Sequence, residues 1–162
     1  ARLRAAANVD GTPYGDLAEQ RLAHPFLLLQ SDYAETGHSR AFMLGNARLL
    51  ANGAGPAWRY EIRWANHYSF TDAPLFFSPP GRFVLSRLIG GERGPVETQR
   101  ATADLLDAFL RAPLGRPPID LGSVAKRYDD IIGGPITPPA APAASPESQA
   151  PLGVADRRRQ AR

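Results

Sequence analysis

The segment from Trp58 to Ala65 alternates apolar and polar side chains at every second position. Its apolar positions are Trp58, Tyr60, Ile62 and Trp64. A period of two residues is typical of a β-strand that buries one of its faces. We therefore predict a half-buried strand over residues 58–65, with His67 in the loop directly after it.

Residues 26–31 show a different pattern, the continuous apolar run Phe-Leu-Leu-Leu-Gln-Ser. This run lies between Pro25 and Asp32, and a short apolar run between turn signals fits a strand buried on both faces of a parallel sheet. A third, short strand is predicted over residues 2–9. The turn-rich cluster Asp10-Gly-Thr-Pro follows it.

The segments between the predicted strands carry helical signals. Asp16 is followed three residues later by Glu19, which fits a capping box at the start of a short helix that ends before Pro25. Residues 39–51 predict a second helix, broken or bent near Gly45.

Two further helices are predicted toward the carboxyl end. One runs from about Gly81 to the glycine pair at 90–91. The other has Pro95 at its first position and apolar residues at helical spacing, and Pro113 ends it. Strands that alternate with helices in this way indicate an α/β fold with parallel strands and flanking helices. Three strands make a thin sheet, and we expect further strands upstream.

The character of the sequence changes after residue 112. Residues 1–112 contain the strand and helix patterns and are predicted to fold together. Residues 113–132 are predicted to be an extension that packs on them as a loop with a short turn of helix. Residues 133–162 are rich in proline, alanine and glycine and carry few bulky apolar side chains, so we predict a disordered tail.

The composition is that of a globular protein, with 43% hydrophobic and 22% charged residues. The net charge is only +3, and four of the arginines lie in the last six residues. Nucleic-acid binding is therefore a weak hypothesis, and we predict no nucleic-acid partner. Cysteine is absent, which excludes disulfides and thiolate catalysis. No apolar run approaches the roughly 18–20 residues of a membrane span, so we predict no integral membrane segment.

Three acid or base side chains follow predicted strands closely. Asp10 follows the strand at 2–9, Asp32 follows the strand at 26–31, and His67 follows the strand at 58–65. The carboxyl ends of parallel strands share one edge of the sheet. A carboxylate beside a histidine fixes the imidazole tautomer and stabilises its charged form, and the histidine then takes a proton from a nucleophile.

Three stretches of the sequence resemble a known family. They are Asn-Val-Asp-Gly-Thr-Pro at 8–13, His-Pro-Phe-Leu-Leu-Leu-Gln-Ser-Asp at 24–32 and Ala-Asn-His-Tyr-Ser-Phe-Thr-Asp at 65–72. Together they resemble the carboxy-terminal half of α/β-hydrolases, most closely the platelet-activating-factor acetylhydrolase type and its bacterial esterase and lipase relatives. The resemblance runs from about residue 2 to about residue 112.

This resemblance implies a serine hydrolase with a triad in the order serine, acid, histidine. His67 would be the base. Asp10 matches the position of the acid in this family type, whereas Asp32 matches its position in many other α/β-hydrolases. We favour Asp10 and keep Asp32 as the alternative acid. Asp72 matches a family position beside the histidine, and we expect it to order that loop or cap the following helix.

The nucleophile of such a triad sits in a Gly-x-Ser-x-Gly turn between a strand and a helix. The nearest match is Gly-His-Ser-Arg-Ala at 37–41, which lacks the second glycine and follows no buried strand. Ser39 also follows both acids, which is the wrong chain order, so we expect it to cap a helix. The chain does not begin with methionine. We therefore expect that the half of the fold with the nucleophile lies upstream.

The sequence thus predicts a carboxylic ester hydrolase that contributes the acid and the histidine of a triad and acts on a small ester or lipid substrate. The resemblance implies no cofactor, and His24, His38 and His67 lack the spacing of metal ligands. The alternative is a degenerate α/β-hydrolase fold without catalytic activity, kept as a binding or structural module.

Overall fold

The structure is a computed structural model that describes residues 3–72, 76, 78, 80, 81, 83, 84 and 92–137. Its strands are β1 (Ala6–Val9), β2 (Phe26–Ser31), β3 (Ala57–Ile62) and β4 (Ile131–Ile136). Its α-helices are α1 (Tyr33–Thr36), α2 (Arg40–Ala51), α4 (Pro95–Arg111) and α5 (Leu121–Ala125). Two short 3-10 helices, η1 (Leu17–Glu19) and η2 (His67–Phe70), complete the described elements.

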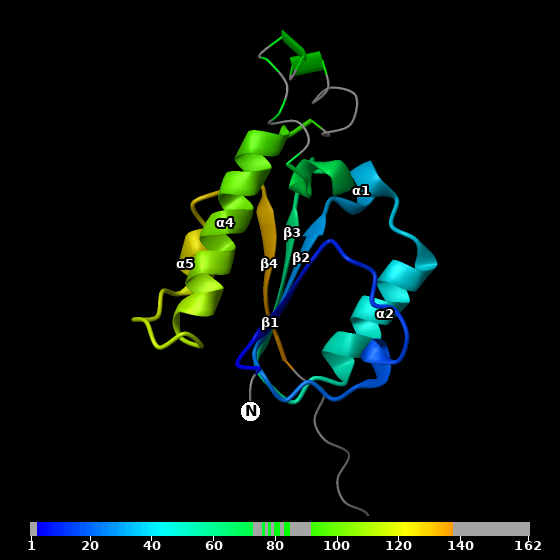
Figure 1. The fold of residues 1–162 in the computed structure, drawn as a ribbon, viewed down its shortest axis with the longest axis vertical. Helices are drawn as coiled ribbons and strands as arrows, with labels where there is room; N and C mark the ends of the chain where they lie inside the picture. Colours follow the sequence, from blue (N-terminus) through cyan, green and yellow to red (C-terminus); the bar gives the residue numbers. More distant parts are fainter. Residues whose placement is uncertain are drawn as a thin grey trace, which may run out of the picture.

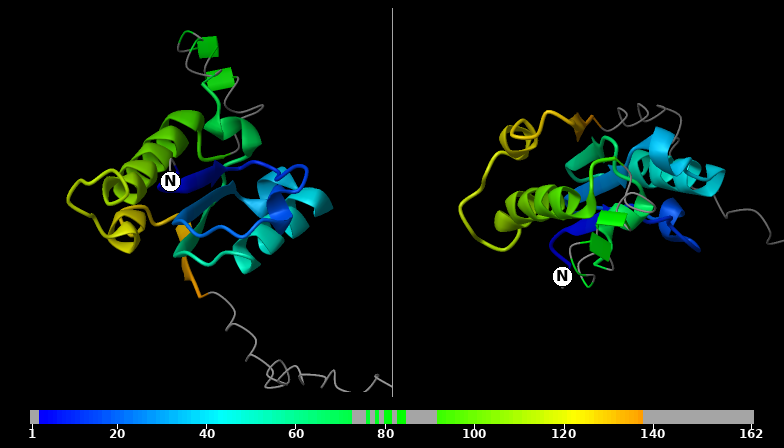
Figure 2. Two further views of the ribbon diagram at one scale, coloured as in Figure 1. Left: turned by 60° about the horizontal axis from the view of Figure 1, so that its bottom comes forward. Right: turned by 90° about the horizontal axis from the view of Figure 1, so that it is seen from above.

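The four strands form one sheet in the order β1-β2-β3-β4. β1, β2 and β3 are parallel, and β4 pairs with β3 in the antiparallel direction. Helices cover both faces of the sheet, with α2 on one side and α4 and α5 on the other (Figures 1 and 2). The predicted α/β fold with parallel strands and flanking helices is therefore confirmed.

The central strand β2 is buried at all six of its positions, as its continuous apolar run predicts. Alternate side chains of β2 face the two helical layers. Leu27 and Leu29 belong to the core cluster that includes Leu105 and Phe109 of α4. Phe26 and Leu28 pack instead with residues of α2. Because both layers need an apolar partner on β2, the polar side chains are confined to the end of this strand.

Strand β3 follows the predicted alternation, but it ends at Ile62 rather than near residue 65. Trp58 and Tyr60 lie on the α4 face, and Tyr60 is fully buried. Trp64 does not continue that face: it has a left-handed φ of 60° and is 46% exposed. The strand ends early because the chain turns after Ile62, although the alternation of apolar and polar residues continues to Trp64.

Helix α2 runs without interruption from Arg40 to Ala51, so the predicted break near Gly45 is absent. Gly45 has a packing role. A Cβ atom at this position would lie 3.3 Å from Cδ of Pro13 in the loop after β1. The glycine therefore lets α2 pack closely against the loop that contains Asp10.

The predicted capping box at Asp16 is also wrong. The chain forms only the three-residue helix η1 here, and the Asp16 side chain makes no capping hydrogen bond. It accepts a hydrogen bond from Gln20 Nε2 at 3.0 Å. Glu19 pairs instead with Arg48 of α2 at 3.2 Å, so both carboxylates that the pattern assigned to a cap have other partners.

Helix α4 confirms the prediction that Pro95 occupies the first helical position, and it ends at Arg111, close to the predicted stop at Pro113. After it, α5 begins with a capping hydrogen bond from the Ser123 N–H to the Asp120 side chain at 2.7 Å. This short helix matches the turn of helix predicted within 113–132.

Strand β4 requires a correction of the predicted tail, because it includes residues 133–136. Its sequence, Ile-Ile-Gly-Gly-Pro-Ile, has no apolar alternation. Close backbone pairing places it in the sheet: a Cβ atom on Gly133 would lie 2.1 Å from the Arg59 carbonyl oxygen. Residues 138–162 of the predicted tail, and most of the helix predicted from about Gly81, lie outside the described residues.

Candidate active site

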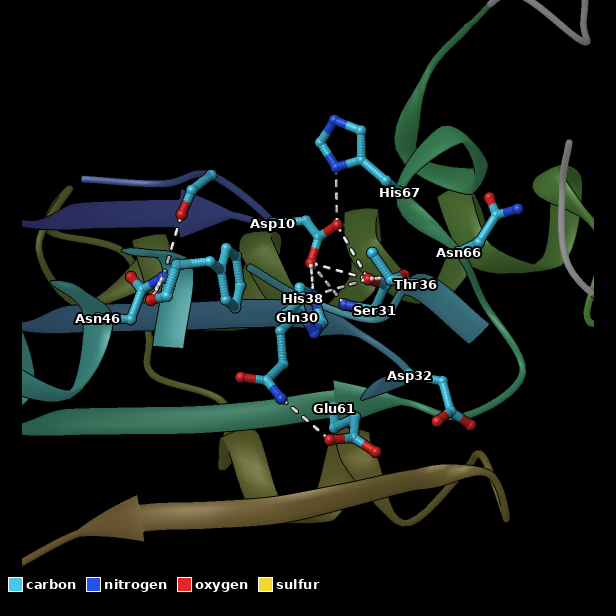
Figure 3. A network of polar contacts seen from close by, with 12 residues as sticks. Asp10, Gln30, Ser31, Asp32, Thr36, His38, Asn46, Glu61, Asn66 and His67 are labelled. Atoms are coloured by element: carbon cyan, nitrogen blue, oxygen red, sulfur yellow. Dashed lines mark hydrogen bonds and ion pairs between the residues drawn. The ribbon is translucent and has the colours of Figure 1, made fainter. Parts of the chain in front are cut away.

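The parallel strands β1, β2 and β3 bring three predicted side chains to one edge of the sheet (Figure 3). Asp10 directly follows β1, Asp32 directly follows β2, and His67 begins η2 after β3. The structure places His67 Nδ1 2.8 Å from Asp10 Oδ2. Asp32 lies apart from this pair and has other partners.

Asp10 is almost completely buried and accepts hydrogen bonds on both carboxylate oxygens. The Ser31 N–H donates to Oδ1 at 2.8 Å. The Ser31 hydroxyl lies 3.0 Å from Oδ1 and 2.9 Å from Oδ2. His38 Nε2 lies 3.0 Å from Oδ1. The Asp10 carboxylate thus has donors from three residues of the neighbouring elements, His67 included.

The pKa of Asp10 reflects two opposing effects. Burial raises it, because a charged carboxylate is less stable away from water. Hydrogen bonds from the Ser31 N–H, His67, His38 and the Ser31 hydroxyl outweigh burial and hold the pKa below its ordinary value of 3.8. The side chain is therefore an ionised hydrogen-bond acceptor over the neutral pH range.

The loop after β1 holds Asp10 in place. Asp10 has a left-handed φ of 50°, and its N–H donates to the Leu29 carbonyl of β2 at 2.8 Å. Asn8 brackets Gly11, since its Oδ1 accepts from the Gly11 N–H at 3.0 Å and its Nδ2 donates to the Gly11 carbonyl at 2.8 Å. Asn46 of α2 donates to the same carbonyl at 3.1 Å. These bonds fix the backbone on either side of the carboxylate.

His67 is presented by a capped 3-10 helix. Asn66 Oδ1 accepts from the N–H groups of Tyr68 and Ser69, and the Asn66 N–H donates to the Ser69 hydroxyl at 3.1 Å. This reciprocal cap places His67 at the first position of η2. The His67 side chain is 58% exposed, whereas the Asp10 side chain is 1% exposed. The imidazole is therefore bound at Nδ1 and open to solvent elsewhere.

Asp32, the alternative acid of the sequence prediction, organises the neighbouring loops. Its Oδ1 accepts from the Ala34 N–H at 2.9 Å, which caps α1. Its Oδ2 accepts from the Trp64 N–H at 2.9 Å and from Arg63 Nε at 3.0 Å. Burial raises the pKa of Asp32, but the hydrogen bonds from Trp64, Ala34 and Arg63, together with the charge of Arg63, hold it below 3.8. His67 is not among the hydrogen-bond partners that the described residues give to Asp32.

Three residues of this cluster were not predicted from the sequence: Ser31, Thr36 and His38. Thr36 Oγ1 lies 2.6 Å from Ser31 Oγ, and His38 Nε2 lies 3.0 Å from the same hydroxyl. Ser31 had a usable signal, because it is the last residue of the predicted strand 26–31 and therefore lies at the same edge of the sheet as Asp10. Thr36 and His38 lie on α1 and in the loop after it, where no periodicity relates them to the acid.

The remaining predicted residues are Ser39 and Asp72. The Ser39 hydroxyl accepts from the Phe42 N–H at 3.1 Å and so caps α2. Asp72 is exposed, and the segment after it lies mostly outside the described residues. Within residues 3–72 and 92–137 together with the few described positions between them, no group of three or more acidic or histidine side chains fits a metal ion.

Comparison with known proteins places the fold. No protein-family model and no curated protein matches the sequence. Among solved structures, the chain matches a ferulic acid esterase from Streptomyces cinnamoneus with a TM-score of 0.63 and 21% sequence identity, over 82% of this chain and 40% of the esterase chain. The described part of the chain therefore shares the fold of the matching part of that esterase. At this identity the likeness to that esterase concerns the fold alone.

Ligands of open α/β sheets generally bind at the carboxyl ends of the strands. Asp10 and His67 lie at that edge (Figure 3). The more specific resemblance to the platelet-activating-factor acetylhydrolase type stays a prediction. In the part of the chain that the structure describes, no helix has the length and apolar character needed to cross a membrane.

Proposed function

We propose that this chain contributes the acid and the base of a serine esterase, with Asp10 as the acid and His67 as the base. One observation carries the proposal, the 2.8 Å contact between Asp10 Oδ2 and His67 Nδ1. An ionised Asp10 has no proton to donate, so the proton of this hydrogen bond belongs to His67 Nδ1. In the neutral form of the ring, His67 Nε2 then carries a lone pair, as a general base requires.

In the proposed mechanism, His67 Nε2 takes the proton of a serine hydroxyl as its oxygen attacks the ester carbonyl. His67 then gives that proton to the leaving alcohol, and an acyl-enzyme forms. Water attacks the acyl-enzyme with the same base, and the carboxylic acid is released. Asp10 keeps the imidazole in the Nδ1–H tautomer and stabilises its charged form while the proton is on Nε2.

We propose that the serine comes from outside these 162 residues. None of the eight serines in the sequence lies in a Gly-x-Ser-x-Gly turn, and four of them, Ser31, Ser39, Ser69 and Ser123, lie in residues 3–72 and 92–137. Ser31 hydrogen-bonds to Asp10, and Ser39 caps α2. Ser69 is fully buried in the cap of η2, and Ser123 donates to Asp120 at 2.7 Å. Each of these hydroxyl groups therefore has a structural partner away from His67 Nε2.

The test is hydrolysis of a panel of nitrophenyl esters and of methyl ferulate by the natural polypeptide that contains this sequence. His67→Ala is expected to lower kcat/KM by about 10³-fold or more, because the base of the acyl transfer is lost. His24→Ala is the matched control, since His24 precedes the opposite end of β2, and its kcat/KM should stay within a few-fold of wild type. The 162 residues alone should not turn over esters.

Three results would count against the proposal. Activity of His67→Ala within a few-fold of wild type removes His67 as the base. Turnover by the isolated 162 residues shows that the serine lies within them. A natural polypeptide without any ester hydrolysis favours the alternative of a binding module with a degenerate hydrolase fold. The relative rates on methyl ferulate and on the alkyl esters decide the substrate class.

A further inference from the structure

Hydrogen-bond donors occupy all the favourable acceptor positions of the Asp10 carboxylate. An ionised carboxylate has about four favourable acceptor positions on its two oxygens. Four donors surround Asp10: the Ser31 N–H and His38 Nε2 at Oδ1, and the Ser31 hydroxyl and His67 Nδ1 at Oδ2. Two of the four donors are thus histidine rings on opposite oxygens, and only the ring of His67 is exposed.

The protonation of His38 follows from this geometry. Asp10 has only acceptor oxygens when ionised, so Nε2 of His38 must carry the proton at 3.0 Å from Oδ1. A bare Nε2 would set two lone pairs against each other at that distance. The buried Nδ1 of His38 has no hydrogen-bond partner among the described residues. A proton there would be a buried donor without an acceptor, so the ring is neutral in its Nε2–H form.

The ring of His38 is held from several sides. Its side chain is 2% exposed and stacks on Phe42 of α2, with ring centroids 4.0 Å apart and planes inclined by 15°. Gly37 before it has a left-handed φ of 58° at the end of α1, and Ser39 after it caps α2. The donor of His38 is therefore fixed in direction, with little freedom to follow a carboxylate that rotates.

This arrangement differs from a second catalytic triad. In a triad, the two ring nitrogens of one histidine bind the acid and the serine separately. Here both Asp10 Oδ1 and Ser31 Oγ lie 3.0 Å from the same atom, Nε2 of His38. His38 is also shielded from solvent, so it cannot touch a substrate. Its contact with the proposed reaction passes through Asp10.

We propose that His38 is a positioning residue, a buried neutral imidazole that holds Oδ1 of Asp10 so that Oδ2 stays aimed at His67 Nδ1. This inference rests on the proposed roles of Asp10 and His67. It extends them, because the acid then depends on a histidine that no catalytic step uses. Ser31 and Thr36 support the same carboxylate, through the Ser31 hydroxyl and the 2.6 Å contact between the two hydroxyl oxygens.

The test compares two amides at position 38 in the natural polypeptide. His38→Gln extends its amide nitrogen to about where Nε2 lies, and it can donate to Asp10. His38→Asn places its amide nitrogen near the position of Nδ1, too far back to reach Asp10. Both variants bury one neutral amide, so a general loss of packing affects both. The difference between them isolates the hydrogen bond to Oδ1.

The first readout is the tautomer of each histidine, from the nitrogen chemical shifts of histidine-labelled protein. Wild type should show His38 in the Nε2–H form and His67 in the Nδ1–H form. His38→Gln should keep the Nδ1–H form of His67, and His38→Asn should shift it toward the mixture of a free imidazole. His24 serves as the internal control. An Nδ1–H form of His38 in wild type would overturn the inference, even where a variant fails to fold.

The second readout is ester hydrolysis. His38→Asn should lower kcat by about 10–100-fold with KM within a few-fold, and His38→Gln should recover most of the loss. Equal tautomer populations of His67 in both variants would contradict the positioning role. If His67→Ala keeps its esterase activity while His67 still responds to His38, then the proposed function fails and the positioning contact stands.

Discussion

Asp10 and Asp32 follow neighbouring parallel strands, and both are 3% exposed with a pKa below the ordinary value. Their donors differ. Asp10 accepts from two histidine rings, a serine hydroxyl and one N–H group. Asp32 accepts from two backbone N–H groups and an arginine. One carboxylate therefore faces a group that can exchange a proton, whereas the other is engaged by groups that hold the chain in shape.

This difference shows that burial and a lowered pKa do not identify a catalytic acid by themselves. Asp32 joins two segments: the start of α1, and the turn of Arg63 and Trp64 that follows β3. That turn leads into η2 and so supports the position of His67. We infer that Asp32 acts on the proposed reaction only through the backbone, and that Asp10 acts on it through the imidazole.

The largest expected effect separates the two carboxylates by activity. In the natural polypeptide, Asp10→Asn should lower kcat for ester hydrolysis by about 10³–10⁴-fold, because the amide favours the wrong tautomer of His67. Asp32→Asn should lower kcat by less than about 10-fold, because the imidazole keeps its acid. Steady-state kinetics on the same ester checks both variants. The reverse ranking would make Asp32 the acid and Asp10 the structural carboxylate.

The second effect concerns stability. Asp32→Asn removes the charged acceptor shared by Arg63 and the Trp64 N–H, and it should cost about 1–3 kcal/mol of unfolding free energy. Urea denaturation followed by circular dichroism measures this loss. Asp16→Asn is a suitable control, because Asp16 is exposed and its carboxylate contacts only Gln20 among the described hydrogen bonds. A loss at Asp16 as large as that at Asp32 would contradict the structural role of Asp32.

The third effect is smaller and concerns the unfolding free energy at low pH. Both carboxyl groups have a folded pKa below 3.8, so the folded state binds fewer protons than the unfolded state as the pH falls through that region. Their stabilisation is complete above about pH 4 and is lost progressively below it as the pH falls through the lower folded pKa. Asp32→Asn should therefore flatten the decline of unfolding free energy between about pH 4 and pH 2. A slope equal to that of wild type would show that Asp32 has the same pKa in both states.

The smallest predicted effect tests the cap that presents His67. Asn66→Ala removes the acceptor for the N–H groups of Tyr68 and Ser69 and should cost about 1 kcal/mol of unfolding free energy. Asn66→Ser keeps a capping oxygen and should retain most of that stability. Thermal denaturation compares the two variants. The same loss in both would mean that the side-chain cap does not hold η2.

The strand pattern was sufficient to predict the parallel sheet and the meeting of Asp10, Asp32 and His67 at its edge, whereas the preference for Asp10 over Asp32 came from the family resemblance. The reason is physical: a continuous apolar run and a period of two define parallel strands, and parallel strands end at one edge. It did not predict β4, because the pairing of residues 131–136 with β3 depends on a close backbone approach at Gly133.

His38 shows a different limit of sequence reasoning. Its loop lies between α1 and α2, and its direction depends on a left-handed glycine and on the ring of Phe42. Neither leaves a periodic pattern. The positive φ of Trp64 is likewise not predictable from a periodic pattern, because the Asp32 carboxylate, from another segment, stabilises this turn. Long-range contacts of single side chains decide these positions.

The left-handed backbone of Asp10 restricts which acids evolution or protein engineering can use at this position. Aspartate and asparagine tolerate a φ of 50°, whereas a longer side chain such as glutamate is disfavoured there. Glycine would relieve the backbone strain, but it would leave the buried donors of Ser31 and His38 without an acceptor. At position 10, relief of the backbone strain and retention of the buried acceptor therefore oppose each other, because the residue that best suits the backbone has no carboxylate.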